Sequence, residues 1–181
     1  MHVISRDAPC YYLTSVTEKR LSVFRADKIK VVACSALDEA RTSGGFALYA
    51  YVIMPDHLHV VTDSTLSPSR TLQFINGITS RRIIDYLKKN NHESSLLKLR
   101  HETRRHQYRF SLWNHHPDAR LLLTERMLMQ RVTYTHQNPV RAGIVVQPLD
   151  YRWSSVRCWN ERPLDDEPLL MDIGRIKWRR S

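Results

Sequence analysis

The stretch FALYAYVIMPDHLHVV, residues 46–61, carries the pattern that decides the fold of this chain. It is apolar and rich in β-favouring residues, apart from one Pro-Asp break that is typical of a turn. We therefore expect a strand at residues 46–54 and a returning strand at residues 57–63. Side chains two apart on a strand point to the same face, so His57 and His59 should share one. Burying two unpartnered imidazoles costs free energy, and a metal ion bound by both would offset that cost.

The segments around this pair of strands predict a fold class. From the N-terminus we expect a strand at residues 10–16, a helix at 25–41, the two strands at 46–63, a helix at 68–89, a strand at 107–113 and a helix from Thr124 to Gln137 that stops at Pro139. The first six elements follow the order β-α-β-β-α-β. This order is typical of a ferredoxin-like α+β sandwich, with an antiparallel sheet and helices on one face. We expect one domain over residues 1–160 and a basic tail over residues 161–181.

The charge of the chain favours a polyanionic partner. Lys and Arg number 28 against 18 acidic residues, which gives a net charge of +10. Most of these cations are arginines, whose planar fork binds phosphate through two prongs. The same excess of charge could also simply keep an ordinary basic protein soluble. No apolar run approaches the length of a membrane span, and three widely spaced cysteines indicate reduced thiols, so we expect a cytoplasmic, nucleoid-associated protein.

A second informative stretch, RVTYTHQNPVRAGIV, covers residues 131–145. Tyr134 and Asn138 are four residues apart near the end of the last predicted helix, so they share a face. Tyr134 offers a hydroxyl nucleophile and Asn138 offers a carbonyl oxygen to a metal. Each residue also has a plainer interpretation, because strand histidines and helix tyrosines are usually structural, and Asn-Pro commonly ends a helix. The combination of the two stretches, rather than any single residue, favours a phosphoryl-transfer site.

The two stretches together resemble a known family. YVIMPDHLHVV is similar to the HUH motif of single-tyrosine transposases related to the IS200-type insertion sequences. RVTYTHQNPVRAGIV resembles the helix that carries their catalytic tyrosine. The N-terminal ISRDAPCYYLTSVTEKR and the later DYRWSSVRCW also resemble segments of the REP-associated tyrosine transposases, so the likeness covers residues 3–160. Leu58 is the bulky apolar residue that the motif has between its histidines.

The resemblance implies a function and a set of roles. It implies a ferredoxin-like enzyme that cleaves and rejoins single-stranded hairpin DNA of the REP type through a 5′-phosphotyrosine. It implies that Tyr134 is the nucleophile and that His57, His59 and Asn138 bind a divalent ion, Mg²⁺ or Mn²⁺. Insertion-sequence relatives act as dimers that share active sites, whereas we favour a monomer here.

Basic side chains on the second predicted helix and on the tail are candidates for DNA contacts, although they could equally form a solvated surface. They are Arg81, Arg82, Lys88, Lys89, Arg175, Lys177, Arg179 and Arg180.

Two other classes of function remain open at this level. The chain could be a non-catalytic basic protein that keeps the fold and binds nucleic acid without forming a covalent adduct. It could also be a metal-dependent hydrolase of small substrates, which would need a closed apolar pocket and would bind with little sensitivity to salt.

Overall fold

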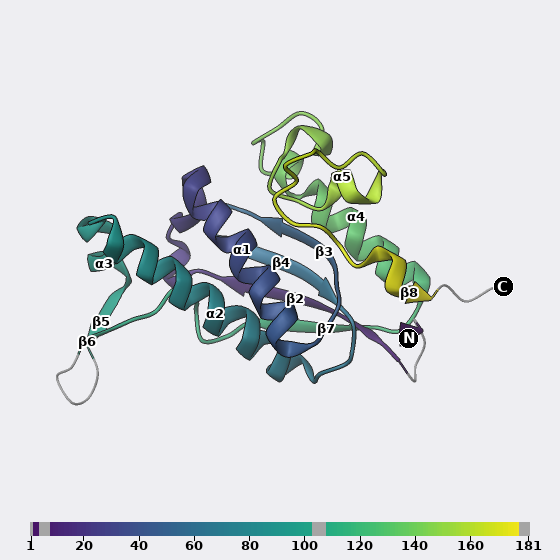
Figure 1. Cartoon of the computed structure of the whole chain (residues 1–181), viewed down its shortest axis with the longest axis horizontal. Helices are drawn as coiled ribbons and strands as arrows, with labels where there is room; N and C mark the ends of the chain where they lie inside the picture. The colour runs from purple at the N-terminus through teal and green to yellow at the C-terminus, as the bar shows by residue number, and fades with distance from the viewer. Residues whose placement is uncertain (1, 4–7, 103–107, 178–181) are drawn as a thin grey trace.

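A computed structural model describes residues 2–3, 8–102 and 108–177, and its centre is a four-stranded antiparallel sheet (Figure 1). The strands are β2 (Cys10–Val16), β3 (Leu48–Ile53), β4 (His57–Thr62) and β7 (Asp118–Leu122), and they lie in the order β3-β4-β2-β7. This order, with a helix between the first two strands and another between the last two, is the ferredoxin-like arrangement. The α+β fold predicted from the sequence is confirmed.

Two long helices cover one face of the sheet, where they lie side by side (Figure 1). They are α1 (Asp27–Gly44) and α2 (Pro68–Lys89). Helix α2 begins where the Ser67 side chain accepts a hydrogen bond from the Arg70 amide, and α1 ends at Gly45, whose φ of 69° suits glycine. Both helices pack against Leu13, Leu58 and Val60 of the sheet. This layer forms the larger part of the core.

A third long helix, α4 (Glu125–Arg141), packs on the opposite face of the sheet. The Thr124 side chain accepts a hydrogen bond from the Met127 amide and caps its first turn. Leu128 and Val132 of α4 are buried against Tyr12 and Val61 of the sheet. The sheet is thus sandwiched, and β4 turns Leu58 and Val60 toward one layer and its odd-numbered residues toward the other.

Short elements complete the chain and close one sheet edge. They are β1 (His2–Val3), η1 (Glu18–Arg20), η2 (Val23–Arg25), α3 (Glu93–Leu99), β5 (Arg100–Glu102), β6 (Tyr108–Phe110), η3 (Pro148–Asp150), α5 (Val156–Trp159), η4 (Ile173–Arg175) and β8 (Ile176–Lys177). Strand β8 pairs in parallel with β1. The outer edge of β3 donates to the carbonyl of Trp153 and accepts from the amides of Ser155 and Asp172.

The last sheet strand and the last helix differ from the sequence prediction. The predicted strand at residues 107–113 contributes to β6, which pairs with β5 outside the main sheet, and Gln107 lies outside the described residues. The fourth sheet strand is β7 instead. Helix α4 was expected to stop at Pro139, yet it continues to Arg141 with Pro139 inside. A proline this close to the helix end removes only one backbone hydrogen bond, and Pro139 is buried.

No helix in the described ranges is long and apolar enough to cross a membrane.

Candidate active site

The two histidines of the HLH motif sit on the sheet face that α4 covers. Both are on β4, and Leu58 between them is buried in the opposite core layer. The imidazole rings lie edge to face, with centroids 4.8 Å apart and planes at 72°. The shared face predicted from the sequence is therefore present in the structure.

Each imidazole is held through its Nδ1 atom, and for His57 the partner is a carboxylate. His57 Nδ1 lies 2.6 Å from Asp56 Oδ1, and Arg20 Nη1 lies 3.0 Å from Asp56 Oδ2. Burial alone raises the pKa of Asp56, but the hydrogen bonds from His57 and Arg20 outweigh it and hold that pKa below its ordinary value. An ionised Asp56 accepts the Nδ1 proton of His57, which leaves Nε2 with a lone pair for a ligand.

His59 is more deeply buried, and two hydroxyls hold it. Its Nδ1 lies 2.8 Å from the Tyr12 hydroxyl oxygen and 2.9 Å from the Thr14 hydroxyl oxygen. Burial, followed by electrostatic interaction with His57 and Arg131, lowers the pKa of His59 to about 3. The ring is therefore neutral at pH 7. When its Nδ1 proton is donated to one of these hydroxyls, its Nε2 lone pair is available to a metal.

Helix α4 brings Tyr134 to this pair of histidines. The half-buried ring of Tyr134 lies edge to face with His59 at a centroid distance of 5.9 Å. It also lies 6.2 Å from the ring of Tyr12. The guanidinium carbons of Arg131 and Arg141 lie 5.8 Å and 5.1 Å from the centre of the Tyr134 ring. Two motifs about 75 residues apart in sequence thus meet within one chain.

Asn138 follows Tyr134 by one helical turn and stays within α4. Its side chain is buried, and its amide nitrogen donates to the Tyr134 carbonyl oxygen at 2.8 Å. The side-chain oxygen of Asn138 has no hydrogen-bond partner in the described part of the chain. Asn138 therefore has an oxygen to offer on the helix that carries the tyrosine.

The available ligands suit a divalent ion, although they are few. No cluster of three or more His, Cys, Asp and Glu side chains suited to a metal occurs among the described residues. Two imidazoles with tethered Nδ1 atoms nevertheless offer two nitrogen ligands through Nε2, and a third ligand would be an amide oxygen such as that of Asn138.

The predicted DNA contacts on α2 lie in the layer on the other side of the sheet from Tyr134. Arg81 and Lys89 are exposed, whereas the Arg82 guanidinium makes a two-pronged ion pair with Glu39 at 2.7 and 2.8 Å. The Lys88 ammonium lies 5.0 Å from the centre of the Phe110 ring.

The predicted contacts on the tail are only partly described. Arg175 is exposed, the side chain of Lys177 is not described, and Arg179 and Arg180 lie outside the described residues.

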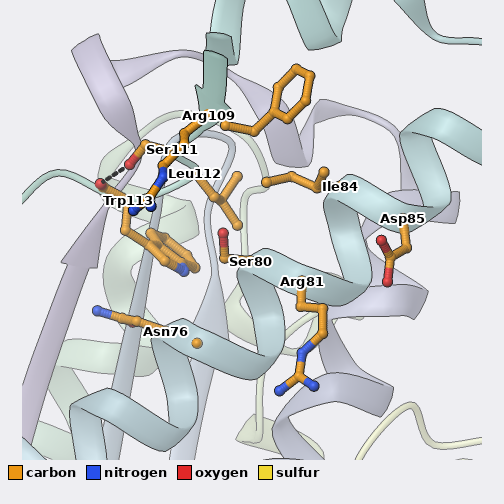
Figure 2. A pocket seen from close by; sticks show the side chains of 11 residues that line it. Asn76, Ser80, Arg81, Ile84, Asp85, Arg109, Ser111, Leu112 and Trp113 are labelled. Atoms are coloured by element: carbon orange, nitrogen blue, oxygen red, sulfur yellow. Dashed lines mark hydrogen bonds between the residues drawn. The ribbon is translucent and has the colours of Figure 1, made fainter. Parts of the chain in front are cut away.

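A groove of about 550 Å³ opens on the α2 side of the molecule (Figure 2). Figure 2 shows Arg81 on α2 and Arg109 on the facing segment, with Trp113 between the two walls. Trp113 is buried and donates to the Thr79 hydroxyl at 3.0 Å, so it is a core residue and not a stacking platform for a base. The groove is lined by α2 and residues 109–113, and none of the histidine or tyrosine side chains described above lines it.

Several residues of the site escape a search for sequence motifs. Tyr12 and Thr14 are on β2 and reach His59 through the pairing of β2 with β4, which a motif does not encode. Arg131 and Arg141 could have been found, because they follow the helical spacing of Tyr134 and Asn138. His136 is a buried structural residue whose Nε2 lies 2.9 Å from the Ser155 hydroxyl.

Comparison with known proteins places the chain in a family. The family model described as "Transposase IS200 like" matches residues 8–116, which is more than half of the chain and includes His57 and His59. The chain belongs to the IS200-like transposase family. No curated protein sequence matches it.

Two solved structures resemble this IS200-like transposase. A REP-associated tyrosine transposase bound to a REP hairpin superposes with a TM-score of 0.56 at 17% identity, over 92% of this chain and 87% of that one. A predicted transposase from Deinococcus radiodurans R1 has a TM-score of 0.45 at 21% identity, over 69% of this chain and 86% of that one. The first of these shows a shared fold.

Proposed function

We propose that this transposase cleaves and rejoins single-stranded hairpin DNA of the REP type through a 5′-phosphotyrosine on Tyr134. The observation that carries the proposal is the position of the Tyr134 ring, 5.9 Å from the His59 ring in the same chain. Covalent phosphoryl transfer needs a nucleophile close to groups that can bind a metal ion, and Tyr134 lies beside two imidazoles of this kind. The REP hairpin bound to the structural neighbour makes DNA hairpins the natural substrates to test.

The residues that would hold a divalent ion, Mg²⁺ or Mn²⁺, are His57, His59 and Asn138. When bound, such an ion would supply Lewis-acid polarisation of the scissile phosphate and neutralise charge that develops on it. Asp56 orients His57, and the hydroxyls of Tyr12 and Thr14 orient His59. These partners hold the rings in place before any ligand arrives, which lowers the reorganisation needed on binding.

In the proposed reaction the Tyr134 hydroxyl oxygen forms a bond to phosphorus in line with the bond to the 3′ oxygen, which breaks. The phenolic proton passes to solvent, and the departing 3′ oxygen takes a proton from solvent. The products are a DNA end joined to Tyr134 through its 5′ phosphate and a free 3′-hydroxyl. A second 3′-hydroxyl reverses the bond changes on a new strand, and the ester bond energy is conserved throughout.

The unit that performs this reaction is proposed to be residues 1–160 of a single chain, with residues 161–181 as a C-terminal extension. Tyr134 meets His59 without a second subunit, which supports action as a monomer. The cations of α2 would contact DNA away from the cleavage point, because α2 and Tyr134 lie on opposite faces of the sheet.

The proposal is tested by incubating the protein with end-labelled single-stranded hairpin DNA and Mg²⁺ or Mn²⁺. We expect a protein–DNA adduct that survives denaturing electrophoresis, disappears with Tyr134→Phe and disappears with EDTA. His57→Ala should abolish the adduct while hairpin binding remains within about threefold, since phosphate contacts elsewhere dominate affinity. Tight hairpin binding without an adduct in the unaltered protein would instead favour the non-catalytic binding protein.

A further inference from the structure

Two arginines stand on either side of Tyr134 along α4. Arg131 precedes it by three residues and Arg141 follows it by seven, so all three side chains lie on one stripe of the helix. The guanidinium carbons lie 5.8 Å and 5.1 Å from the Tyr134 ring centre, and that of Arg131 also lies 5.1 Å from the Tyr12 ring centre. The tyrosine is therefore flanked by two cations.

Within the described residues, no carboxylate neutralises these two guanidinium groups. In the described residues neither Arg131 nor Arg141 has a carboxylate partner, although other arginines do, as Arg82 has Glu39. Arg131 is half-buried among aromatic rings, where an unpaired charge is costly unless an anion joins it. Asp56, the carboxylate beside the histidines, is already engaged by His57 and Arg20.

We infer that Arg131 and Arg141 form a two-armed clamp that holds a phosphodiester at the Tyr134 hydroxyl, and this inference rests on the proposed function. The ligand class is a phosphodiester monoanion, which keeps the same charge when it is free and when it is joined to the tyrosine. A guanidinium fork binds the two non-bridging oxygens of such a group. The clamp therefore adds no bond-making step; it positions the phosphate before transfer and retains it afterwards.

The two arms should contribute differently because their surroundings differ. Arg131 is half-buried between Tyr12 and Tyr134, so its guanidinium is already oriented. Arg141 is exposed in the last turn of α4, so it can close over a bound strand. Because Arg141 is exposed, substituting it leaves the core intact, and a defect in that variant reports on the ligand and not on folding.

The test compares Arg131→Gln and Arg141→Gln with Arg126→Gln, a matched exposed control on the same helix. In single-turnover assays with hairpin DNA, we expect each clamp variant to form adduct about tenfold or more slowly, because a preorganised charge facing the phosphate is lost. Hairpin affinity should change by less than about threefold, since most phosphate contacts remain. Arg126→Gln should match the unaltered protein, and Arg131→Lys should recover only part of the rate.

A second measurement does not depend on catalysis. Inorganic phosphate is titrated into the DNA-free protein while the Nε–Hε signals of its arginines are followed by NMR. We expect the signals of Arg131 and Arg141 to shift together and that of Arg126 to stay. Absence of a shift, or adduct rates within twofold of the unaltered protein, would overturn the clamp. If phosphate shifts both signals but the unaltered protein forms no adduct, the clamp stands and the proposed function fails.

Discussion

His59 and His136 are both buried, and burial lowers the pKa of each. His59 is placed beside Tyr134, whereas His136 points away from it and meets the Ser155 hydroxyl. The two residues show how one residue type serves different ends: a neutral imidazole at pH 7 is a good ligand in one position and a hydrogen-bonded core group in the other. Both histidines affect stability in the same way, because protonation of a buried imidazole favours the unfolded chain.

This cost predicts how stability depends on pH. Burial lowers the pKa of His136 from 6.5 to about 4, so between these values the unfolded chain binds more protons than the folded one. The free energy of unfolding should therefore fall as pH drops through this window, by up to about 1.4 kcal/mol per pH unit for one such histidine. Urea unfolding of His136→Gln between pH 7 and 4 should show a flatter dependence.

The exposed His116→Gln serves as the matched control for that experiment and should keep the slope of the unaltered protein. An unchanged slope in His136→Gln would show that this histidine is not the group that titrates.

Helix α4 is the element that assembles the site. Leu128 and Val132 of the helix are buried against the sheet, and the neighbouring stripe of the helix carries Arg131, Tyr134 and Arg141. The packing of α4 on the sheet therefore fixes the position of Tyr134, the proposed nucleophile. Its attachment also involves Ser155, which accepts from the Tyr51 amide on β3 and lies 2.9 Å from His136.

Loosening this helix should weaken the fold and the site together. Leu128→Ala removes a fully buried side chain and should lower the free energy of unfolding by about 2–5 kcal/mol, through lost burial and the cavity left behind. Met129→Ala, on the neighbouring and partly exposed position, should cost much less. Chemical denaturation of both variants checks the difference, and equal losses would contradict the placement of α4.

The elements also show where sequence patterns succeed and fail. The strands at β2, β3 and β4 and the helices α1 and α2 follow clear apolar periodicity, so their positions were predictable. Strand β7 is an edge strand with four exposed residues in DARLL, and this leaves no alternating apolar signal. The more apolar QYRFSLW segment has a stronger strand pattern, but only Tyr108–Phe110 of it form a strand, in a small separate sheet.

The candidate site was predictable to a similar extent. That His57 and His59 share a face follows from the two-residue period of a strand. The proximity of Tyr134 to the histidines depends on how α4 crosses the sheet, so sequence spacing alone could not predict it. The expectation came from the family resemblance. The hydroxyls of Tyr12 and Thr14 depend on the register of β2 against β4, which no local pattern records.

At the scale of the whole molecule, one chain brings together the histidine pair and Tyr134 of the candidate site. The histidines, the tyrosine and both flanking arginines come from a single copy, and the net charge of +10 suits a polyanionic partner. Steep salt dependence of hairpin binding is the corresponding expectation.

Action within one chain predicts the result of a mixing experiment. Tyr134→Phe and His57→Ala are each expected to form no adduct, and a mixture of the two should remain inactive because neither copy holds a full site. Adduct formation on hairpin DNA measures this directly. Recovery of about a quarter or more of the unaltered activity in the mixture would indicate that subunits exchange Tyr134, as expected of a dimer with shared sites.

The central claim is that Tyr134 becomes covalently joined to a DNA 5′ phosphate. The most direct measurement is mass spectrometry of the adduct after digestion with trypsin and nuclease. Cleavage after Arg131 and Arg141 releases VTYTHQNPVR, residues 132–141, in which Tyr134 is the sole tyrosine. We predict that this peptide carries the nucleotide 5′-phosphate mass on Tyr134, and a nucleotide found on any other residue, Tyr12 included, would contradict the account.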